Sequence, residues 1–275
     1  MAKSKFGQNF LIDKKIIRRV INAAKLSQED TVLEIGAGHG ELTGLIAEKA
    51  EKVFAVERDN ELCRSLHLKF SKSKNVELVK RDILKLDIGK LAFPEKENHT
   101  PGHRNKLKII GNLPYYITSP ILMKLFRSKD YLDYITIIVQ KEVSDRMAAS
   151  PGSRSYSTLS LAVHYHAKIE HVFPISSNSF RPQPEVDSSL ISMSIRKKAP
   201  VDLSDEESFF RFVKGIFGGR RKMLYNAISR VTPVEKKDAE KLLLKIDIDP
   251  RARPETISLN KFANIFETIK RYSVQ

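Results

Sequence analysis

The stretch TVLEIGAGHGEL, Thr31 to Leu42, joins a short β-rich run, a glycine-rich loop and the start of a helical pattern. Strand, glycine loop and helix in this order are typical of open α/β sheets, which bind ligands at the carboxyl ends of their strands. The loop contains Gly36, Gly38 and Gly40. The third glycine of a nicotinamide-dinucleotide fingerprint would fall on Glu41, and the lysine of a P-loop is absent. The stretch therefore predicts a nucleoside site without a phosphate cradle.

Strand-like runs recur along the chain and alternate with helix-length segments. Ahead of the glycine loop, apolar residues from Ile16 to Ala24 repeat at helical spacing after a candidate cap, Asp13. After it come the runs KVFAVE (52–57), VELVK (76–80), LKIIG (107–111) and YITIIV (134–139). Strands that alternate with helices imply right-handed crossovers and a parallel sheet covered on both faces. The predicted fold class is α/β, with a doubly wound, Rossmann-like domain.

The composition changes at RKKAPVDLSDEES, Arg196 to Ser208. Beyond this segment the pattern is helical, and residues 209–234 contain no Asp or Glu although Lys and Arg accumulate there. We therefore predict an α/β domain over residues 1–200 and a small basic α-helical domain over residues 201–275. Within the first domain, the polar stretch over 93–106 predicts a surface loop.

The overall charge is strongly positive. Lysine and arginine number 48 against 33 aspartates and glutamates, which gives a formal charge of +15 and a pI near 9.7. Such an excess indicates a polyanionic partner. The single cysteine, Cys63, rules out an internal disulfide framework and fits a reducing compartment. No signal peptide or run of membrane-spanning length is recognisable, so we expect a cytoplasmic protein that binds no membrane and is a monomer.

Two histidine pairs invite a metal-site interpretation that their spacing does not support. A proline and a glycine between His99 and His103 prevent a helical i,i+4 face. His164 and His166 would share one face of a strand, but no cysteine or carboxylate stands at ligand spacing from them. The sequence predicts no metal site.

Two carboxylates stand at the ends of the second and third predicted strands. Glu57 ends the second strand, where a carboxylate can accept hydrogen bonds from both hydroxyls of a ribose and excludes a 2′-phosphate. Asp82 follows the third strand, where it can meet the exocyclic amine of an adenine. Either acid alone is typical of a solvated strand end. Together with the glycine loop they predict an adenosine pocket, which S-adenosylmethionine fits.

The fourth strand ends in IIGNLPYYITSP, Ile109 to Pro120. With this segment the chain resembles the ribosomal RNA adenine dimethyltransferase family along almost its whole length. The resemblance is carried by separate motifs in a fixed order: FGQNFLID (6–13), EIGAGHG (34–40), NLPYYITSP (112–120), VQKEVSDRM (139–147), SFRPQPEVDSS (179–189) and FGGRRKMLYNAI (217–228).

The resemblance implies an rRNA (adenine-N6,N6)-dimethyltransferase of ribosome biogenesis. Its substrate would be two adjacent adenosines in the hairpin loop near the 3′ end of small-subunit (16S-type) rRNA, and its partner the small ribosomal subunit or a precursor. S-adenosylmethionine would be the methyl donor, held by the first domain, while the second would bind RNA. The implied cofactor-binding residues are Asn9, Leu11, Gly36, Glu57, Asp82 and Asn112, with Gln8 and Ile83 as neighbours.

The chemistry explains the residue types in NLPY. The exocyclic nitrogen of adenine is a poor nucleophile because its lone pair is delocalised into the ring. The side-chain oxygen of Asn112 and a backbone carbonyl of Leu113 or Pro114 can each accept an N–H and align the amine with the methyl group. Pro114 fixes the turn, and Tyr115 can stack on the base. For Asn112 alone, capping of the following helix is the alternative.

Two further roles come from the resemblance. Phe180, ahead of the prolines in SFRPQP, would cover the target adenine opposite Tyr115, although a phenylalanine in such a loop is also typical of a core residue. Arg220, Arg221 and Lys222 would form a basic surface beside RNA.

Two other functions remain open. The antibiotic-resistance type of the same chemistry modifies large-subunit rRNA, but it tends to have isoleucine at the position of Leu113, and FGGRRKMLYNAI resembles the small-subunit group better. A non-enzymatic assembly or transcription factor could keep the fold as an RNA-binding module. Intact Glu57, Asp82 and Asn112 argue against that function.

Overall fold

The structure is a computed structural model that describes residues 8–92, 106–219 and 221–272. Internal contacts divide the chain into two compact units. The sheet unit comprises Met1–Ser144 and Ala167–Ile195, and the helical unit comprises Asp145–His166 and Arg196–Gln275. Within the described residues, no helix is both long and apolar enough to span a bilayer.

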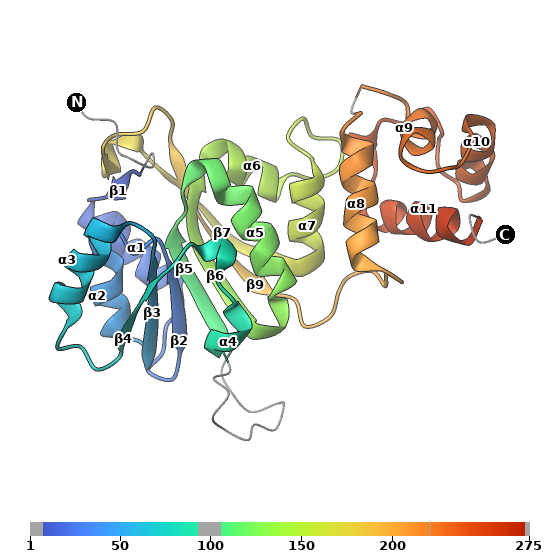
Figure 1. Cartoon of the computed structure of the whole chain (residues 1–275). Coiled ribbons are helices and arrows are strands. Elements are labelled where there is room, and N and C mark those ends of the chain that lie inside the picture. Colours follow the sequence, from blue (N-terminus) through green and yellow to red (C-terminus); the bar gives the residue numbers. More distant parts are fainter. Residues whose placement is uncertain (1–7, 93–105, 220, 273–275) are drawn as a thin grey trace, which may run out of the picture. The chain divides into compact units, whose positions relative to one another are not determined.

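The sheet unit is built on seven strands in the order β4-β3-β2-β5-β6-β9-β7 (Figure 1). The parallel strands are β2 (Thr31–Ile35), β3 (Lys52–Glu57), β4 (Val76–Lys80), β5 (Leu107–Asn112) and β6 (Leu132–Gln140). Two antiparallel strands complete one edge, β9 (Ser188–Ile195) beside β6 and β7 (Ala167–Ile175) beside β9. The strand order reverses between β2 and β5, which is where open α/β sheets bind their ligands.

Helices cover both faces of this sheet because its strands are apolar on both sides. One face packs on α1 (Lys14–Ala23), α2 (Glu41–Ala47) and α3 (Asn60–Phe70) through buried residues such as Val32, Val53 and Ile110. The opposite face carries α5 (Thr118–Arg127), which buries Ile121, Leu122, Leu125 and Phe126 (Figure 1). The remaining short elements of the unit are α4 (Ile88–Ala92) and the 3-10 turns η1 (Ile83–Lys85), η2 (Tyr115–Ile117), η3 (Lys129–Tyr131) and η4 (Ser177–Ser179).

A second, two-stranded sheet joins distant parts of the chain. Strand β1 (Phe10–Leu11) pairs antiparallel with β8 (Phe180–Arg181), with Leu11 opposite Phe180. The backbone N–H of Ile12 extends the contact by donating to the carbonyl of Ser179 at 2.9 Å. In Figure 1 the dark blue N-terminal segment accordingly runs beside the yellow segment that contains β8.

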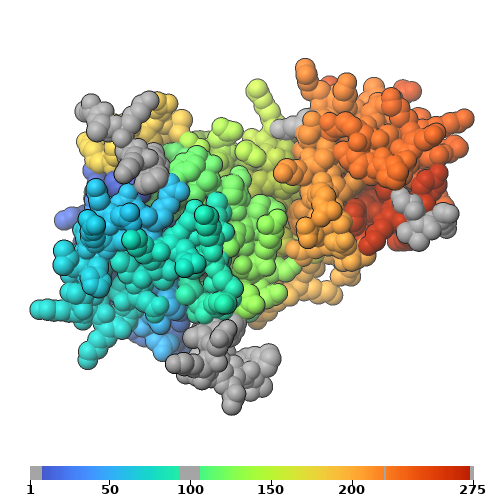
Figure 2. Space-filling model, in the orientation of Figure 1, coloured from blue at the N-terminus to red at the C-terminus, as the bar shows by residue number. Residues whose placement is uncertain are grey.

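The helical unit contains α7 (Thr158–His166), α8 (Glu206–Phe217), α9 (Leu224–Val231), α10 (Lys236–Lys245), η5 (Pro254–Thr256) and α11 (Leu259–Tyr272). Helix α6 (Lys141–Ala148) spans the transition from the sheet unit into it. The core is aromatic: Phe209 lies edge-on to Phe266 at 5.6 Å, and Phe217 lies 5.8 Å from Phe262, between ring centroids. The atoms of α8 to α11, orange to red, form one continuous body in the space-filling view (Figure 2).

The strands predicted from sequence agree with β2 to β6, and the cap predicted at Asp13 is confirmed, since its carboxylate accepts from the N–H of Lys15 at 2.8 Å. The contacts divide the chain differently from the predicted boundary at residue 200. They place 145–166 in the helical unit, because α7 packs on α8 and α11. The expected strand at His164 and His166 is wrong: both lie in α7, whose residues 159–163 are all buried and show no helical stripe. Most of the loop predicted over 93–106 lies outside the described residues.

The central strands approach each other most closely at Gly111. This residue faces Ile35 in the register of β5 with β2. A Cβ atom at position 111 would lie 2.5 Å from the carbonyl oxygen of Ile35. Since that neighbour is backbone in the centre of a sheet, it cannot move aside without shifting a strand. Glycine is thus required directly before Asn112.

Glu34 is a buried carboxyl in the middle of β2. It is 1% exposed, and the hydroxyl of Thr43 donates to its Oε2 at 2.5 Å. Its Oε1 has no hydrogen-bond partner among the described residues. Burial raises the pKa of Glu34 from its ordinary value of 4.5 to about 8, against the opposing effect of the Thr43 hydrogen bond. At neutral pH the side chain therefore keeps its proton.

We expect Gly111→Ala to lower the free energy of unfolding by about 1–3 kcal/mol, as overpacking of a close-packed interior does. The matched control is Gly44→Ala in α2, where the nearest atom to the added Cβ is 3.9 Å away. Alanine also has the higher helix propensity, so the control should be neutral or stabilising. Urea denaturation of both variants measures the difference. Equal stability of Gly111→Ala and the wild type would contradict the close approach of β2 and β5.

Glu34 should make the fold less stable as pH rises. Between about pH 5 and 8 the folded state keeps the Glu34 proton that the unfolded chain loses, so unfolding becomes easier as pH increases and levels off above 8. Glu34→Gln keeps an acceptor for Thr43 and removes the titration, so its unfolding free energy should fall less over this range. Urea denaturation at pH 5.5 and 8.0 tests this, with exposed Glu51→Gln as the control. Identical pH slopes for Glu34→Gln and the wild type would show that Glu34 is ionised in the fold.

Candidate active site

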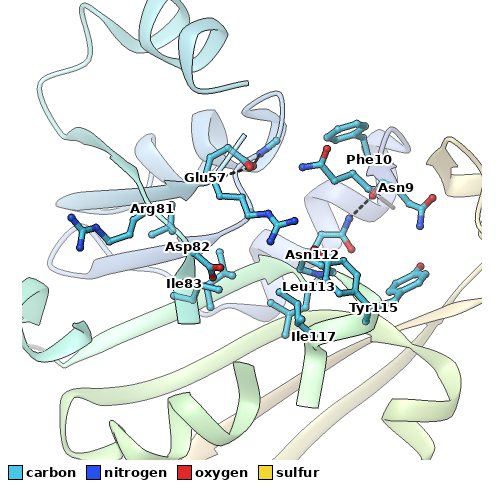
Figure 3. A pocket seen from close by; sticks show the side chains of 18 residues that line it. Asn9, Phe10, Glu57, Arg81, Asp82, Ile83, Asn112, Leu113, Tyr115 and Ile117 are labelled. Atoms are coloured by element: carbon cyan, nitrogen blue, oxygen red, sulfur yellow. Dashed lines mark hydrogen bonds between the residues drawn. The ribbon is translucent and has the colours of Figure 1, made fainter. Parts of the chain in front are cut away.

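A cavity lies at the carboxyl ends of the parallel strands, inside the sheet unit. It has about 740 Å³ of empty space, part of it open to solvent. It is lined by the backbone of the glycine loop and by side chains from the N-terminal segment and the ends of β3, β4 and β5 (Figure 3). The lining residues are Gln8, Asn9, Phe10, Ile35, Gly36, Gly38, Val56, Glu57, Arg58, Arg81, Asp82, Ile83 and the run from Asn112 to Ile117.

The glycine loop forms one wall of the cavity with its backbone. Gly36 and Gly38 have φ values of +76° and +58°, a conformation that other residues rarely adopt. The N–H of Gly36 donates to the carbonyl of Val56 at 2.9 Å, which ties the loop to the end of β3. A Cβ at Gly38 would lie 3.2 Å from the ring of Phe10. The loop thus presents main chain, rather than side chains, to whatever occupies the cavity.

Glu57 is held rigidly at the end of β3. Its Oε2 accepts from the N–H of Gly38 at 3.1 Å, and its Oε1 accepts from the N–H groups of Arg58 and Asp59 at 2.8 and 3.0 Å. A carboxylate has about four acceptor sites, so three backbone partners leave one. Glu57 can therefore accept from one ribose hydroxyl without losing a backbone partner, whereas the sequence analysis expected it to accept from two.

Asp82 lies across the cavity at the end of β4. One of its oxygens, Oδ1, accepts from the N–H of Leu84 at 2.9 Å and caps the turn η1. Ile83, directly after it, is buried and lines the cavity. Figure 3 shows Asp82 and Ile83 together on the side of the cavity away from Asn9. A carboxylate beside an apolar side chain suits the amine edge and the face of an adenine.

Asn112 has a defined amide orientation. Its Nδ2 donates to the backbone carbonyl of Asn9 at 2.7 Å, the contact dashed in Figure 3. Since a carbonyl can only accept, the amide nitrogen must face Asn9 and the side-chain oxygen Oδ1 is left as an acceptor. The alternative of a helix cap does not apply, because neither η2 nor α5 has a side-chain cap.

In the turn after Asn112, the backbone groups of Leu113 and Pro114 have different hydrogen-bond partners. The N–H of Leu113 donates to the carbonyl of Ile138 at 3.0 Å and so continues the pairing with β6. The carbonyl of Pro114 already accepts from the N–H of Ile117 at 3.2 Å and from the hydroxyl of Thr118 at 3.0 Å. Of the two backbone carbonyls considered for the substrate amine, the one of Leu113 is therefore favoured.

Tyr115 lines the cavity with its hydroxyl anchored elsewhere. The phenolic oxygen lies 2.6 Å from Oγ of Ser188, at the start of β9. Burial raises the pKa of the Tyr115 hydroxyl above its ordinary value of 10.0, against the opposing effect of the Ser188 hydrogen bond. The neutral hydroxyl positions the ring, and the ring face is what the side chain offers to the cavity.

Two predicted site residues lie in the core instead. Phe180 is fully buried, at 0% exposure, and Leu11 is 6% exposed. Both belong to the apolar cluster beneath α1 and α2, and neither lines the cavity. Their pairing across β1 and β8 explains this: the two short strands close over the sheet and direct both side chains inward. Neither side chain lines the cavity in this structure, and the stacking role of Phe180 and the cofactor contact of Leu11 stay predictions.

The predicted RNA-binding residues belong to the helical unit. Arg221 and Lys222 are exposed in the turn between α8 and α9, and Arg220 lies outside the described residues. Other cations of the acid-free run are engaged locally: Arg230 donates to the carbonyl of Gly215 at 2.6 Å, and Arg211 pairs with Glu207 at 3.1 Å. Arg221 and Lys222 are therefore exposed cations of this run, as are Arg211, Lys214 and Arg230, and the RNA-binding role stays a prediction.

The cavity also contains residues that the sequence analysis did not single out. Phe10 packs against the glycine loop, 4.4 Å from the ring of His39 between centroids. Arg58 and Tyr116 lie at the cavity with the Arg58 guanidinium carbon 5.9 Å from the Tyr116 ring centroid. The signal was their position directly beside Glu57 and Tyr115 at strand ends. In the described part of the chain, no group of three or more His, Cys, Asp or Glu side chains is placed to hold a metal ion.

Comparison with known proteins gives consistent matches over the whole chain. The family model described as ribosomal RNA adenine dimethylase matches residues 1–271. A ribosomal RNA small subunit methyltransferase A from Caldanaerobacter subterraneus subsp. tengcongensis is 40% identical over 264 residues, covering 96% of each chain.

Two solved structures are similar in fold over almost the whole chain. The 23S rRNA methyltransferase ErmE has a TM-score of 0.70 and 25% identity, with 95% of this chain and 100% of that one covered. A dimethyladenosine transferase from Plasmodium falciparum has a TM-score of 0.78 at 23% identity, with 96% and 98% covered. The latter similarity concerns the fold alone.

Proposed function

The chain belongs to the ribosomal RNA adenine dimethylase family, and we propose that it dimethylates N6 of two adjacent adenosines near the 3′ end of small-subunit rRNA, using S-adenosylmethionine. The observation that carries the proposal is the amide of Asn112, turned by the carbonyl of Asn9 so that its oxygen is an acceptor at a nucleoside-sized cavity. The small-subunit relative supports the substrate.

The cavity fits the cofactor. S-adenosylmethionine supplies an electrophilic methyl group to the amine of the substrate. The remaining acceptor site of Glu57 would bind a ribose hydroxyl, and Asp82 with Ile83 would hold the adenine. The bare backbone at Gly36 and Gly38 gives room for the amino-acid part, beside Gln8 and Asn9. Leu11 has no direct side-chain role in this proposal.

The reacting amine would be held by two acceptors. Oδ1 of Asn112 and the carbonyl of Leu113 each accept one N–H of the adenine, which favours a more tetrahedral nitrogen whose lone pair can attack. The backbone of both residues is fixed by the pairing of β5 with β6, so the acceptors are oriented before the base arrives. Tyr115 offers its ring face to the base while Ser188 holds its hydroxyl.

No strong general base is required by this arrangement. The methylated amine is acidic and can release its proton to solvent after transfer. The first methyl group also removes one N–H, so one of the two acceptors becomes redundant for the second transfer. A neutral amide tolerates that loss better than a fixed carboxylate would, because an unpaired charge next to the methyl group costs more free energy.

Two other functions fit less well. A large-subunit rRNA methyltransferase is represented by ErmE, but the identity to it is 25%, against 40% to the small-subunit enzyme. A non-enzymatic RNA-binding protein would have no use for a rigid carboxylate at Glu57 and an oriented amide at Asn112. Mass mapping of methylated adenines, after incubation with unmodified small subunits and S-adenosylmethionine, distinguishes all three.

Asn112→Ala should slow methyl transfer by on the order of 10²-fold, by analogy with the loss of one aligned polar contact at a reacting centre. The measurement is single-turnover transfer to unmodified small subunits at saturating S-adenosylmethionine, so that weaker cofactor binding does not contribute. Exposed Asn260→Ala in α11 is the matched control and should transfer at the wild-type rate. Transfer of both methyl groups by Asn112→Ala at the wild-type rate would refute the mechanism.

Replacing Arg220, Arg221 and Lys222 together with alanine should flatten the salt dependence of RNA binding. If each contacts a phosphate, the log-log slope should fall by roughly 2, at about 0.7 per contact. The control replaces Lys236, Lys237 and Lys241 in α10, which removes the same charge from another exposed face of the helical unit. If both triple variants change the slope equally, the effect is one of net charge and the basic turn is no RNA site.

A further inference from the structure

We propose that Tyr116 and Arg58 form a second nucleotide subsite at the rim of the cavity, which holds the unpaired adenosine next to the one being methylated. The inference rests on the proposed function and extends it from the reacting base to its neighbour. Its chemistry is that of single-stranded RNA recognition, in which an exposed aromatic ring and a cation lie together.

The two consecutive tyrosines have different surroundings. Tyr115 is anchored through its hydroxyl to Ser188, whereas Tyr116 is 56% exposed. Both lie in the 3-10 turn η2, in which successive side chains leave the backbone about 120° apart. With Tyr115 directed inward, Tyr116 must therefore point in another direction while still lining the cavity. An exposed ring at the mouth of a base-binding cavity is available for stacking.

Arg58 supplies the cation. Its guanidinium carbon lies 5.9 Å from the centroid of the Tyr116 ring, within the range of a cation–π contact. Its backbone is fixed, because its N–H donates to Oε1 of Glu57 at 2.8 Å. Arg58 therefore starts from the rigid end of β3 and reaches the ring across the cavity mouth. The guanidinium of Arg58, a half-buried residue, can neutralise a backbone phosphate of RNA whose base stacks on Tyr116.

The substrate creates the need for such a subsite. When an adenosine leaves its stack to enter the cavity, the neighbouring base loses a stacking partner, which opposes binding. A ring at the rim replaces that partner. Since two adjacent adenosines are modified, the base next to the one in the cavity is an adenosine in both cases, on the 3′ side in one and on the 5′ side in the other, and the subsite would hold at least one of these neighbours.

A substrate with one base removed tests the proposal. Small subunits are reconstituted with rRNA whose synthetic 3′ fragment carries one target adenosine beside an abasic nucleotide, in either order, and single-turnover transfer to the remaining adenosine is measured. The wild type should transfer about tenfold more slowly to the abasic substrate than to the intact pair in at least one order, since one stacked base is worth about 1–3 kcal/mol. With Tyr116→Leu, the transfer rate to the intact pair should fall by the same factor, and the rate to the abasic substrate should not fall further.

Matched controls separate the subsite from general effects. Tyr131→Leu, in η3 and away from the cavity lining, and Arg64→Ala, exposed on α3, should behave as the wild type on both substrates. Arg58→Ala should weaken transfer to the intact pair severalfold and reduce its salt dependence.

Each other outcome has a definite meaning. If Tyr116→Leu transfers as fast as the wild type, or loses the same factor on intact and abasic substrates, the subsite is refuted. If calorimetry shows that Tyr116→Leu and Arg58→Ala bind S-adenosylmethionine more weakly while the effect of the abasic nucleotide is unchanged, the pair belongs to the cofactor site and the subsite is refuted as well. If the wild type transfers no methyl group to the intact pair, the proposed function itself fails.

Discussion

The site depends on how closely β2 and β5 approach at the centre of the sheet. A side chain at Gly111 would collide with the carbonyl of Ile35, so the two strands can pair in this register only because position 111 has none. The consequence is local and chemical. Gly36 directly follows β2 and Asn112 ends β5, and the Asn112 carbonyl lies 3.5 Å from where a Gly36 Cβ would be. The wall of the proposed cofactor pocket and the amide proposed to hold the substrate are thereby placed side by side.

The orientation of Asn112 comes from a more distant part of the chain. The carbonyl of Asn9 fixes the amide, and Asn9 precedes β1, which is held by β8. The residues that close this small sheet, Leu11 and Phe180, are core residues for that reason. Their contribution to the site is indirect, since their burial keeps the N-terminal segment over the cavity. This explains how residues that do not line the cavity can lie within the motifs by which the chain resembles the family.

Charged and uncharged groups have different proposed roles in the site. At the proposed reacting centre the acceptors would be an amide and a backbone carbonyl, which suits an amine that loses its hydrogen atoms in two successive transfers. The carboxylates Glu57 and Asp82 stand at the strands that would hold the cofactor, and each is oriented by backbone N–H groups. The proposed phosphate contacts belong to cations, Arg58 in the sheet unit and Arg221 and Lys222 in the helical unit. Phosphate contacts of this kind would position an RNA without entering the chemistry.

The alternation of apolar runs with helical patterns was sufficient to predict β2 to β6. Four of them, β2, β3, β5 and β6, are buried on both faces, so their side chains specify them locally. The same locality made Glu57, Asp82 and Asn112 recognisable, since parallel strands bring their carboxyl ends to one edge.

Other features depended on contacts between segments far apart in sequence. The β1 and β8 pairing, two residues on each strand, has no periodicity to detect, and it decides that Phe180 and Leu11 are buried rather than exposed to a ligand. Helix α7 is buried almost all round and shows no helical stripe, so its sequence could not distinguish it from a strand until its neighbours α8 and α11 were known. The 3-10 turn after Pro114 likewise separates Tyr115 from Tyr116, two identical residues, because only one of them finds Ser188 within hydrogen-bonding distance.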